Sequence, residues 1–393
     1  MDPYANEWLD FLARWLHVVA GIVWIGTSFY FIALDNHLAR PGEDAGEGVG
    51  GEAWEVHGGG FYRVQKYRVA PPSLPERLLW FKWEAYTTWL SGFALFIVLY
   101  YVNARTYLID RSVADLSPTE AIAISVALLG VAWIVYDVLC RLVRNELVVA
   151  AALVGLTTLA AWGCSRLFSG RAEYIQVGAM LGTIMAANVF LVIIPAHWEL
   201  VRAKKTGREP DPAPGVRAKQ RSVHSNYLTL PVLFAMLSNH FPSSYGHSYS
   251  WLVLIAMMLI GAWIRLFFNL RHTGRTVWAI PVTAALAIAG VAVAIRPTGG
   301  GGGAASAATV PFVRVRAIVE QRCVPCHSAH PSRVAVAPKG VELDTPAEIA
   351  ARAAQIEQVA VTTKTMPIGN VTGMTQAERD ALGAWIRHGS RIK

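Results

Sequence analysis

The sequence is poor in charge: Asp, Glu, Lys and Arg make up 16% of its 393 residues, while 54% are hydrophobic and 14 are tryptophan. A soluble protein of this length would carry more charge. Long apolar runs recur through the first three quarters of the chain, and each is long enough to cross a hydrocarbon layer. We therefore expect an integral protein of the lipid bilayer with a small polar tail.

Cysteine is scarce as well, with four in the chain. Cys323 and Cys326 lie in the tail, whereas Cys140 and Cys164 lie within or beside apolar segments, where we interpret them as small buried hydrophobic residues. The net charge of +8 does not indicate a nucleic-acid partner, because the basic residues cluster in loops beside apolar runs. The N-terminal stretch is acidic where a signal peptide would be basic, so we expect the first span to stay in the membrane.

Eight membrane-spanning helices are predicted, because an isolated span in lipid must satisfy its own backbone hydrogen bonds. They cover 9–34, 78–102, 119–140, 146–166, 173–200, 223–241, 249–270 and 276–295. The loops after the odd-numbered helices hold 16 Lys and Arg, and those after helices 2, 4 and 6 hold 4. The positive-inside rule then predicts cytoplasmic odd-numbered loops and periplasmic N- and C-termini.

Three parts are predicted along the chain: a membrane domain at 1–296, a Gly- and Ala-rich linker at 297–311, and a polar domain at 312–393. The fold class we expect is all-α. It combines a polytopic membrane helical bundle of about eight spans with a small all-α domain like a class I cytochrome c. In the long first loop, alternation around 64–69 permits a short strand.

The stretch CVPCH, residues 323–327, has the C-x-x-C-H pattern of haem c attachment. Cys323 and Cys326, three apart on one helical turn, would form thioethers with the two vinyl groups of a covalent haem c. His327 would then be the proximal iron ligand. The tail has no second pair of metal ligands at zinc spacing, so a haem is favoured over a zinc half-site.

Met366 is the predicted sixth ligand of this iron, because it precedes Pro367 in an extended loop that contains glycine. Met374 leads into the last helix and is interpreted as a packing residue. Methionine and histidine together raise the haem potential, which suits an electron acceptor. Haem c is attached outside the cytoplasmic membrane of bacteria, which agrees with the loop charges and predicts a bacterial inner-membrane protein.

Polar residues inside apolar helices are costly and usually functional. In the first helix, Arg14, His17, Gly21, Trp24 and Ser28 share one face. One interpretation is a b-type haem with His17 as axial ligand and Arg14 near a propionate. On depth alone, His240 is the favoured second ligand. The other interpretation is a histidine hydrogen-bonded to a neighbouring helix, with Gly21 at a close helix crossing.

Other polar residues of the apolar segments include Glu84, Asp137, Asn188 and His224. The loop VHGGGFYRVQKY is the densest unusual segment outside the spans. His57, Phe61, Tyr62 and Lys66 there offer ring stacking, a cation and a flexible glycine backbone, which suit a planar anionic substrate. A structural loop packed across the helix ends is an equally open interpretation.

Several of these segments together resemble one family. The chain is similar throughout to the bacterial membrane-bound, cytochrome c-linked urate oxidases, or urate hydroxylases. The resemblance rests on the combination of WLHVVAGIVWIGTSFYF, WEVHGGGFYRVQKY, WFKWEAYTTWLSGF, HSNYLTLPVLFAMLSNHFP, CVPCH and MPIGNVTGMTQAER. It implies oxidation of urate to 5-hydroxyisourate without hydrogen peroxide. Electrons would pass to haem c and on to a periplasmic or membrane acceptor, a cytochrome c or a terminal oxidase.

The first helix is also similar to the His-bearing first helix of membrane protoporphyrinogen oxidases, which bind haem b. For urate, the chemistry needs a base, which a buried carboxylate or a histidine can supply, and a cation that binds the anion. We assign these polar roles, as a group, to Glu84, His57 and Lys66. Two other functions are open. The membrane part could oxidise quinol as a respiratory electron-transfer protein, or the haem tail could belong to a redox sensor.

Overall fold

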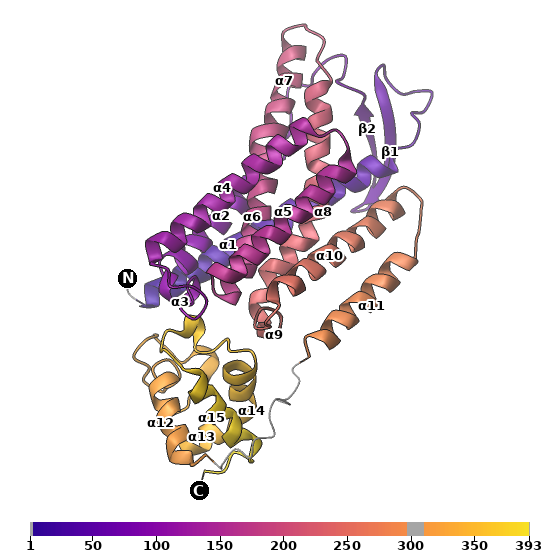
Figure 1. Ribbon diagram of the computed structural model, residues 1–393. Helices are drawn as coiled ribbons and strands as arrows, with labels where there is room; N and C mark the ends of the chain where they lie inside the picture. The colour runs from indigo at the N-terminus through magenta and orange to yellow at the C-terminus, as the bar shows by residue number, and fades with distance from the viewer. Residues whose placement is uncertain (1–2, 297–309, 393) are drawn as a thin grey trace.

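Short polar side chains begin several of the long helices. The computed structural model describes residues 3–296 and 310–392 (Figure 1). Ser117 and Glu120 form a capping box at the start of α4 (Pro118–Leu142). Asn145 accepts hydrogen bonds at the start of α5 (Glu146–Leu167), and Ser169 does so at α6 (Gly170–Asn188). These caps satisfy N–H groups that a helix leaves free, and so fix where each helix begins.

Each of the eight predicted spans contains a helix, although the second begins at Trp83 and the eighth at Ala279, later than the predicted starts at 78 and 276. The remaining elements of the bundle are α1 (Pro3–His37), α2 (Trp83–Phe96) with the π-turn η1 (Ile97–Tyr101), α3 (Ala104–Tyr107), the π-turn η2 (Val189–Ile193), α7 (Ile194–Lys205), α8 (Ala213–Leu237), η3 (Ser238–His240), α9 (Pro242–Tyr245), α10 (Ser250–His272) and α11 (Ala279–Ala294). The fifth span combines α6, η2 and α7. The short helices α3 and α9 lie between spans, and η3 ends the sixth.

Five helical segments of the described chain are long and apolar enough to cross a membrane: Trp8–His37, Pro118–Leu142, Glu146–Leu167, Gly170–Lys205 and Ser250–His272. The protein is therefore consistent with membrane insertion, while the count of eight spans stays a prediction. Of these five, Gly170–Lys205 is the most buried within the bundle. Many large apolar side chains of α1, α4 and α5 point outward instead, as lipid contact requires.

A small antiparallel sheet interrupts the helical pattern. Strands β1 (Val49–His57) and β2 (Gly60–Tyr67) form a hairpin whose turn holds Gly58 and Gly59 at positive φ. The alternation around 64–69 anticipated one of the two strands. Arg63 of β2 donates hydrogen bonds to Asp44 and to Glu52 of β1, which ties the preceding loop to the sheet.

The C-terminal unit, which we define as residues 310–392, has a core of its own. Its elements are α12 (Phe312–Arg322), η4 (Pro338–Gly340), α13 (Pro346–Ala351), α14 (Ala353–Ile356), the π-turn η5 (Glu357–Thr362), η6 (Ile368–Asn370) and α15 (Gln376–Arg387). As expected from sequence, Thr375 and Glu378 cap α15, and its apolar face packs on α12. Residues 297–309 of the predicted linker lie outside the described residues. The division of the chain into domains stays a prediction.

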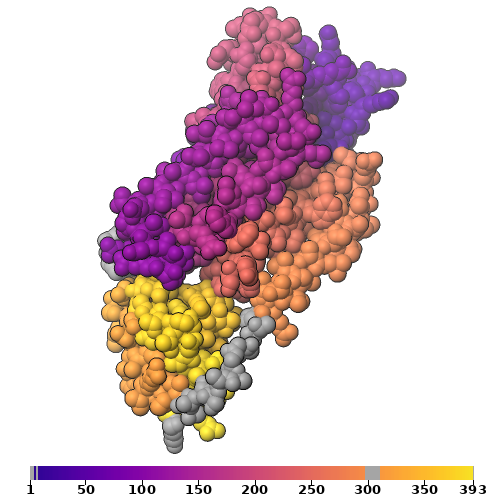
Figure 2. All heavy atoms as spheres, in the orientation of Figure 1, coloured from indigo at the N-terminus to yellow at the C-terminus, as the bar shows by residue number. Residues whose placement is uncertain are grey.

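The C-terminal unit lies against the end of the bundle that carries the N-terminus, while the hairpin and the α7–α8 turn lie at the opposite end (Figure 1). Figure 2 shows its yellow atoms against the purple atoms of the bundle end. The contact is close: a Cβ on Gly369 of η6 would lie 2.5 Å from the carbonyl oxygen of Thr106 in α3. The two termini thus share one end of the molecule, as predicted, although its periplasmic orientation stays a prediction.

Candidate functional sites

The CVPCH segment follows α12 directly as a compact turn. The N–H of Cys323 donates to the carbonyl of Val319, and the N–H groups of Cys326 and His327 both donate to the carbonyl of Cys323. Neither cysteine forms a disulfide within the described residues. Burial raises the pKa of the Cys323 thiol to about 12. The turn therefore brings two unpaired thiols and one imidazole together, as the thioether attachment of a haem requires.

His327 is held in one orientation by the backbone. Its Nδ1 lies 3.1 Å from the carbonyl oxygen of Val341, so Nδ1 carries the proton in this hydrogen bond. No residue of the described chain hydrogen-bonds its Nε2. Metal-bound histidines usually have this arrangement, with one ring nitrogen donating to a carbonyl and the other bare toward the metal. The geometry of His327 thus fits an axial ligand of iron.

Met366 is held from both sides of its peptide group. Its N–H donates to the carbonyl of Val359, and its carbonyl accepts a 2.7 Å hydrogen bond from Arg379 of α15. Arg379 is 5% exposed and also donates to the carbonyl of Ala360. Met374 is only 3% exposed within the core of the unit, in agreement with a packing role.

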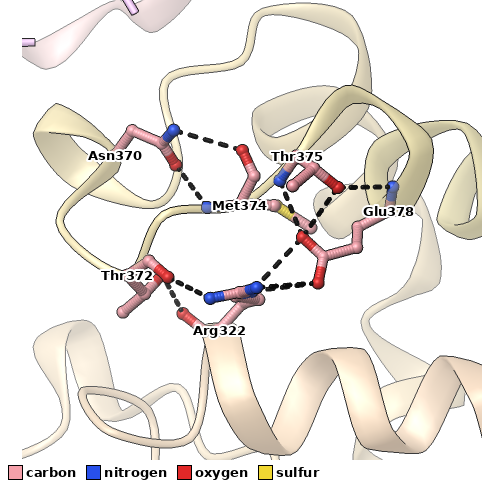
Figure 3. Close-up of polar contacts among 6 residues, drawn as sticks. All are labelled: Arg322, Asn370, Thr372, Met374, Thr375 and Glu378. Carbon is pink, nitrogen blue, oxygen red and sulfur yellow. Dashed lines mark hydrogen bonds and ion pairs between the residues drawn. The ribbon is translucent and has the colours of Figure 1, made fainter. Parts of the chain in front are cut away.

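A polar network joins the end of α12 to the loop after Met366 (Figure 3). The guanidinium of Arg322, one residue before Cys323, donates to the carboxylate of Glu378 at 3.0 Å and to the carbonyl of Thr372. The side chain of Asn370 accepts from the N–H of Met374 and donates to its carbonyl. Burial raises the pKa of Glu378, but hydrogen bonds from Thr375 and Arg322 outweigh this, leaving it below its ordinary value. The network holds the predicted ligand loop against the attachment turn.

The three predicted catalytic residues do not converge. Glu84 lies in the first turn of α2, and its Oε2 is buried without a hydrogen-bond partner. His57 is exposed at the hairpin turn. Lys66 forms an ion pair with Asp35 at the end of α1, with 2.5 Å between Nζ and Oδ1. Their catalytic roles stay predictions, and the cation expected at Lys66 is paired with a carboxylate.

His17 packs on the second helix. Its Nδ1 lies 3.0 Å from the carbonyl oxygen of Thr88 in α2, which confirms the expected hydrogen bond to a neighbouring helix. The close crossing falls at Gly92, where a Cβ would lie 2.7 Å from the His17 ring, whereas one on Gly21 would meet only ordinary contact. A haem on Nε2 of His17 stays a prediction.

The other two residues proposed around a b-type haem are placed differently. Arg14 forms an ion pair with Asp10 at 2.8 Å, one turn earlier on α1, instead of standing free for a propionate. His240 ends the short helix η3 and is exposed. No contact within the described chain joins His240 to His17. Both assignments stay predictions.

Two buried arginines in the bundle did not stand out in the sequence. Arg221 of α8 is 3% exposed and donates to Asp137 of α4 at 2.8 Å. Asp137 also pairs with Arg141 at 2.7 Å. Nearby, His224 links the hydroxyl of Tyr136 to the carboxylate of Glu146, each at 2.8 Å. The charged groups of this cluster, whose sequence-recognised members are Asp137 and His224, pair with one another, while the Nε of Arg221 has no hydrogen-bond partner in the described chain.

The second arginine, Arg265 of α10, has a different environment. It is 3% exposed, its Nε donates to Asn226 of α8 at 2.9 Å, and its Cζ lies 3.7 Å from the ring centroid of Phe29 in α1. Asn269 donates to the same oxygen of Asn226 at 3.0 Å. The sequence signal that could have found Arg265 is its position inside an otherwise apolar helix, where a charged residue is costly and usually functional.

The described residues contain no group of three or more His, Cys, Asp or Glu that could hold a metal ion. A haem iron needs only two axial protein ligands, so this finding concerns sites for other metal ions and does not test a haem site. Residues 3–296 match the protein family described as Urate oxidase N-terminal. The match covers the helical bundle and ends before the C-terminal unit. No curated protein and no solved structure matches the chain.

Proposed function

Since the chain belongs to the urate oxidase N-terminal family, we propose that it is a membrane-bound, cytochrome c-linked oxidoreductase that converts urate to 5-hydroxyisourate. Urate and one water would give 5-hydroxyisourate, two protons and two electrons. The electrons would leave singly through a haem c and pass to the respiratory chain, so no hydrogen peroxide forms. The observation that supports an electron route through haem c is the orientation of His327. Its Nδ1 is held by the Val341 carbonyl, while its Nε2 has no partner in the described chain.

Cys323 and Cys326 would hold the haem covalently, and His327 and Met366 would be its axial ligands. When bound, this haem accepts one electron at a time. The chain's own contribution is positional. Arg379 fixes the carbonyl of Met366, and the Arg322 network ties the Met366 loop to the attachment turn. A b-type haem at His17 remains a further proposal, with Arg14 and His240 as its predicted partners.

In the bundle, Glu84 is our proposed general base. Its unpartnered buried oxygen can accept a proton from a substrate without first giving up an internal hydrogen bond. Exposed His57 and ion-paired Lys66 stay proposed contacts of the purine, with less support from geometry. We propose a bacterial inner-membrane location with periplasmic termini, and a cytochrome c or terminal oxidase as acceptor.

Quinol oxidation is the alternative function, and one feature favours it. A cavity of about 230 Å³ between α5, α8 and α10 is apolar apart from a few groups such as His224 and Tyr227. An apolar wall with a polar edge suits a lipid-soluble ring compound. However, both ring nitrogens of His224 already have partners, the Tyr136 hydroxyl and Glu146. Urate oxidation is therefore preferred.

The test uses anaerobic membranes containing the full chain. Urate, ubiquinol or buffer is added, and haem c reduction is followed by absorbance. We expect urate alone to reduce the haem. In water labelled with heavy oxygen and with an artificial acceptor, the 5-hydroxyisourate should carry the label. Reduction by ubiquinol and not urate would establish the alternative, and peroxide formed in proportion to urate would refute the electron route.

A further inference from the structure

Arg265 is a buried cation with no carboxylate partner. It lies between α1, α8 and α10, and none of the ion pairs of the described chain includes it. A buried charge without a counter-ion is strongly unfavourable, and folded proteins normally pair it. Arg221, equally buried on α8, shows the usual solution, because Asp137 neutralises it. The fold thus supplies a partner to one buried arginine and none to the other.

Unused hydrogen-bonding groups surround Arg265. Its Nη2, the Nδ2 of Asn226 and the Oδ1 of Asn269 are all buried and have no partner in the described chain. Buried polar atoms are nearly always paired, so three orphans in one bonded cluster mark the place of a missing partner. Two of them are donors and one is an acceptor. That set matches a ligand with anionic oxygens and an adjacent N–H group.

The cluster is rigid on the protein side. The face of Phe29 supports the guanidinium of Arg265, and the side-chain oxygen of Asn226 accepts from both Arg265 and Asn269. These contacts hold Nε and leave Nη2 free, so a ligand would not have to displace an internal bond. The helices approach closely one turn earlier, where a Cβ on Gly261 would lie 3.2 Å from the backbone nitrogen of Pro231. Arg265 therefore lies one turn after a close crossing of α8 and α10, and this crossing fixes its position.

We propose that Arg265, Asn226 and Asn269 form the binding site for the anionic edge of a planar oxopurine, which, resting on the proposed function, is the urate anion. The guanidinium binds the anionic oxygens, and the two amides bind the neighbouring carbonyl and N–H groups. This assignment gives the anion-binding role to Arg265 in place of ion-paired Lys66. The site lies in the half of the bundle nearer the hairpin, which is the cytoplasmic half under the predicted topology.

The decisive variant is Asn226→Asp. It has the same shape, keeps an oxygen that accepts from Arg265 and Asn269, and gives Arg265 an internal counter-ion. Binding of labelled urate is measured by equilibrium dialysis on the purified full chain, reduced with dithionite so that no turnover occurs. We expect affinity to fall about tenfold to hundredfold, the effect of losing a charged hydrogen bond, while thermal stability is kept or rises. Arg265→Gln should lose a similar factor.

Arg271→Gln is the matched control, because it removes an exposed cation from the last turn of the same helix and should leave urate affinity unchanged. Wild-type affinity in folded Asn226→Asp would overturn the inference and leave the proposed function standing. So would loss of an acid-extractable haem from Arg265→Gln at unchanged urate affinity, because the cation would then serve a propionate. A wild-type chain that neither binds nor oxidises urate would overturn the proposed function itself.

Discussion

At the scale of single residues, the two methionines of the last segment differ in their surroundings, and this difference predicts their roles. Met366 lies half-buried in a loop whose peptide group is fixed by Val359 and Arg379, so its thioether is free to bind iron. Met366→Ala should therefore leave the haem covalently attached but remove the weak near-infrared absorption band of methionine–iron ligation. Absorbance of the oxidised protein and haem staining of the denatured chain measure the two effects.

Met374→Leu is the control for this experiment. Met374 packs in the core of the C-terminal unit, and leucine of similar volume should cost less than about 1.5 kcal/mol there. The near-infrared band should survive in this variant. A band that persists in Met366→Ala and disappears in Met374→Leu would exchange the two roles.

At the scale of elements, the hairpin depends on carboxylates around one arginine. Hydrogen bonds from Arg63 lower the pKa of Asp44 and of Glu52 below their ordinary values of 3.8 and 4.5. A lowered folded-state pKa stabilises the hairpin above the ordinary pKa, and the contribution is lost as pH falls through the lowered value. We expect amide protection of residues 49–67 to decrease between about pH 5 and pH 2, measured by hydrogen exchange corrected for its intrinsic pH dependence.

Arg63→Gln should weaken this pH dependence, because both carboxyls then lose the group that lowers their pKa most, while Gln65 and Gly42 still donate to Glu52. At neutral pH its hairpin should already exchange as fast as the acidified wild type. Equal protection of the wild-type hairpin at both ends of the pH range would show that the ion pairs contribute nothing measurable, as is common for surface pairs.

The positions of the helices along the chain were largely predictable from sequence, while the side chains that meet between helices were not. Apolar runs located the long helices of the bundle, and the Thr375–Glu378 pattern located the start of α15, because both signals are local in sequence. The cluster of Arg265 and Asn226 joins residues 39 positions apart, and nothing in either helix alone indicates the contact. For the same reason, Glu84, His57 and Lys66 were grouped by residue type, and no hydrogen bond or ion pair of the described residues joins them.

At the scale of the whole molecule, the C-terminal unit meets the bundle closely at two glycines: Gly369 of η6, and Gly246 after α9, where a Cβ would lie 2.6 Å from the Cβ of Thr363. Gly369 has a φ of 55°, and a Cβ there would lie 2.5 Å from the Thr106 carbonyl oxygen and 2.9 Å from that of Ile109. Backbone atoms cannot move aside as a flexible side chain can. The loop that follows Met366 is thus seated directly on the end of the bundle, where electrons released by the substrate would have to leave.

Gly369→Ala should therefore disturb this contact without unfolding either unit, while the contact at Gly246 remains. We expect haem content and reduction by dithionite to be unchanged, while haem reduction by urate slows and amides of residues 104–109 exchange faster. Gly340→Ala is the matched control, since Gly340 has a similar φ of 62° but open space around its Cβ. Both variants bear the same left-handed backbone strain of about 1–2 kcal/mol, so only the clash differs. Equal urate-dependent rates in the two variants would mean that electron transfer does not require this docked arrangement.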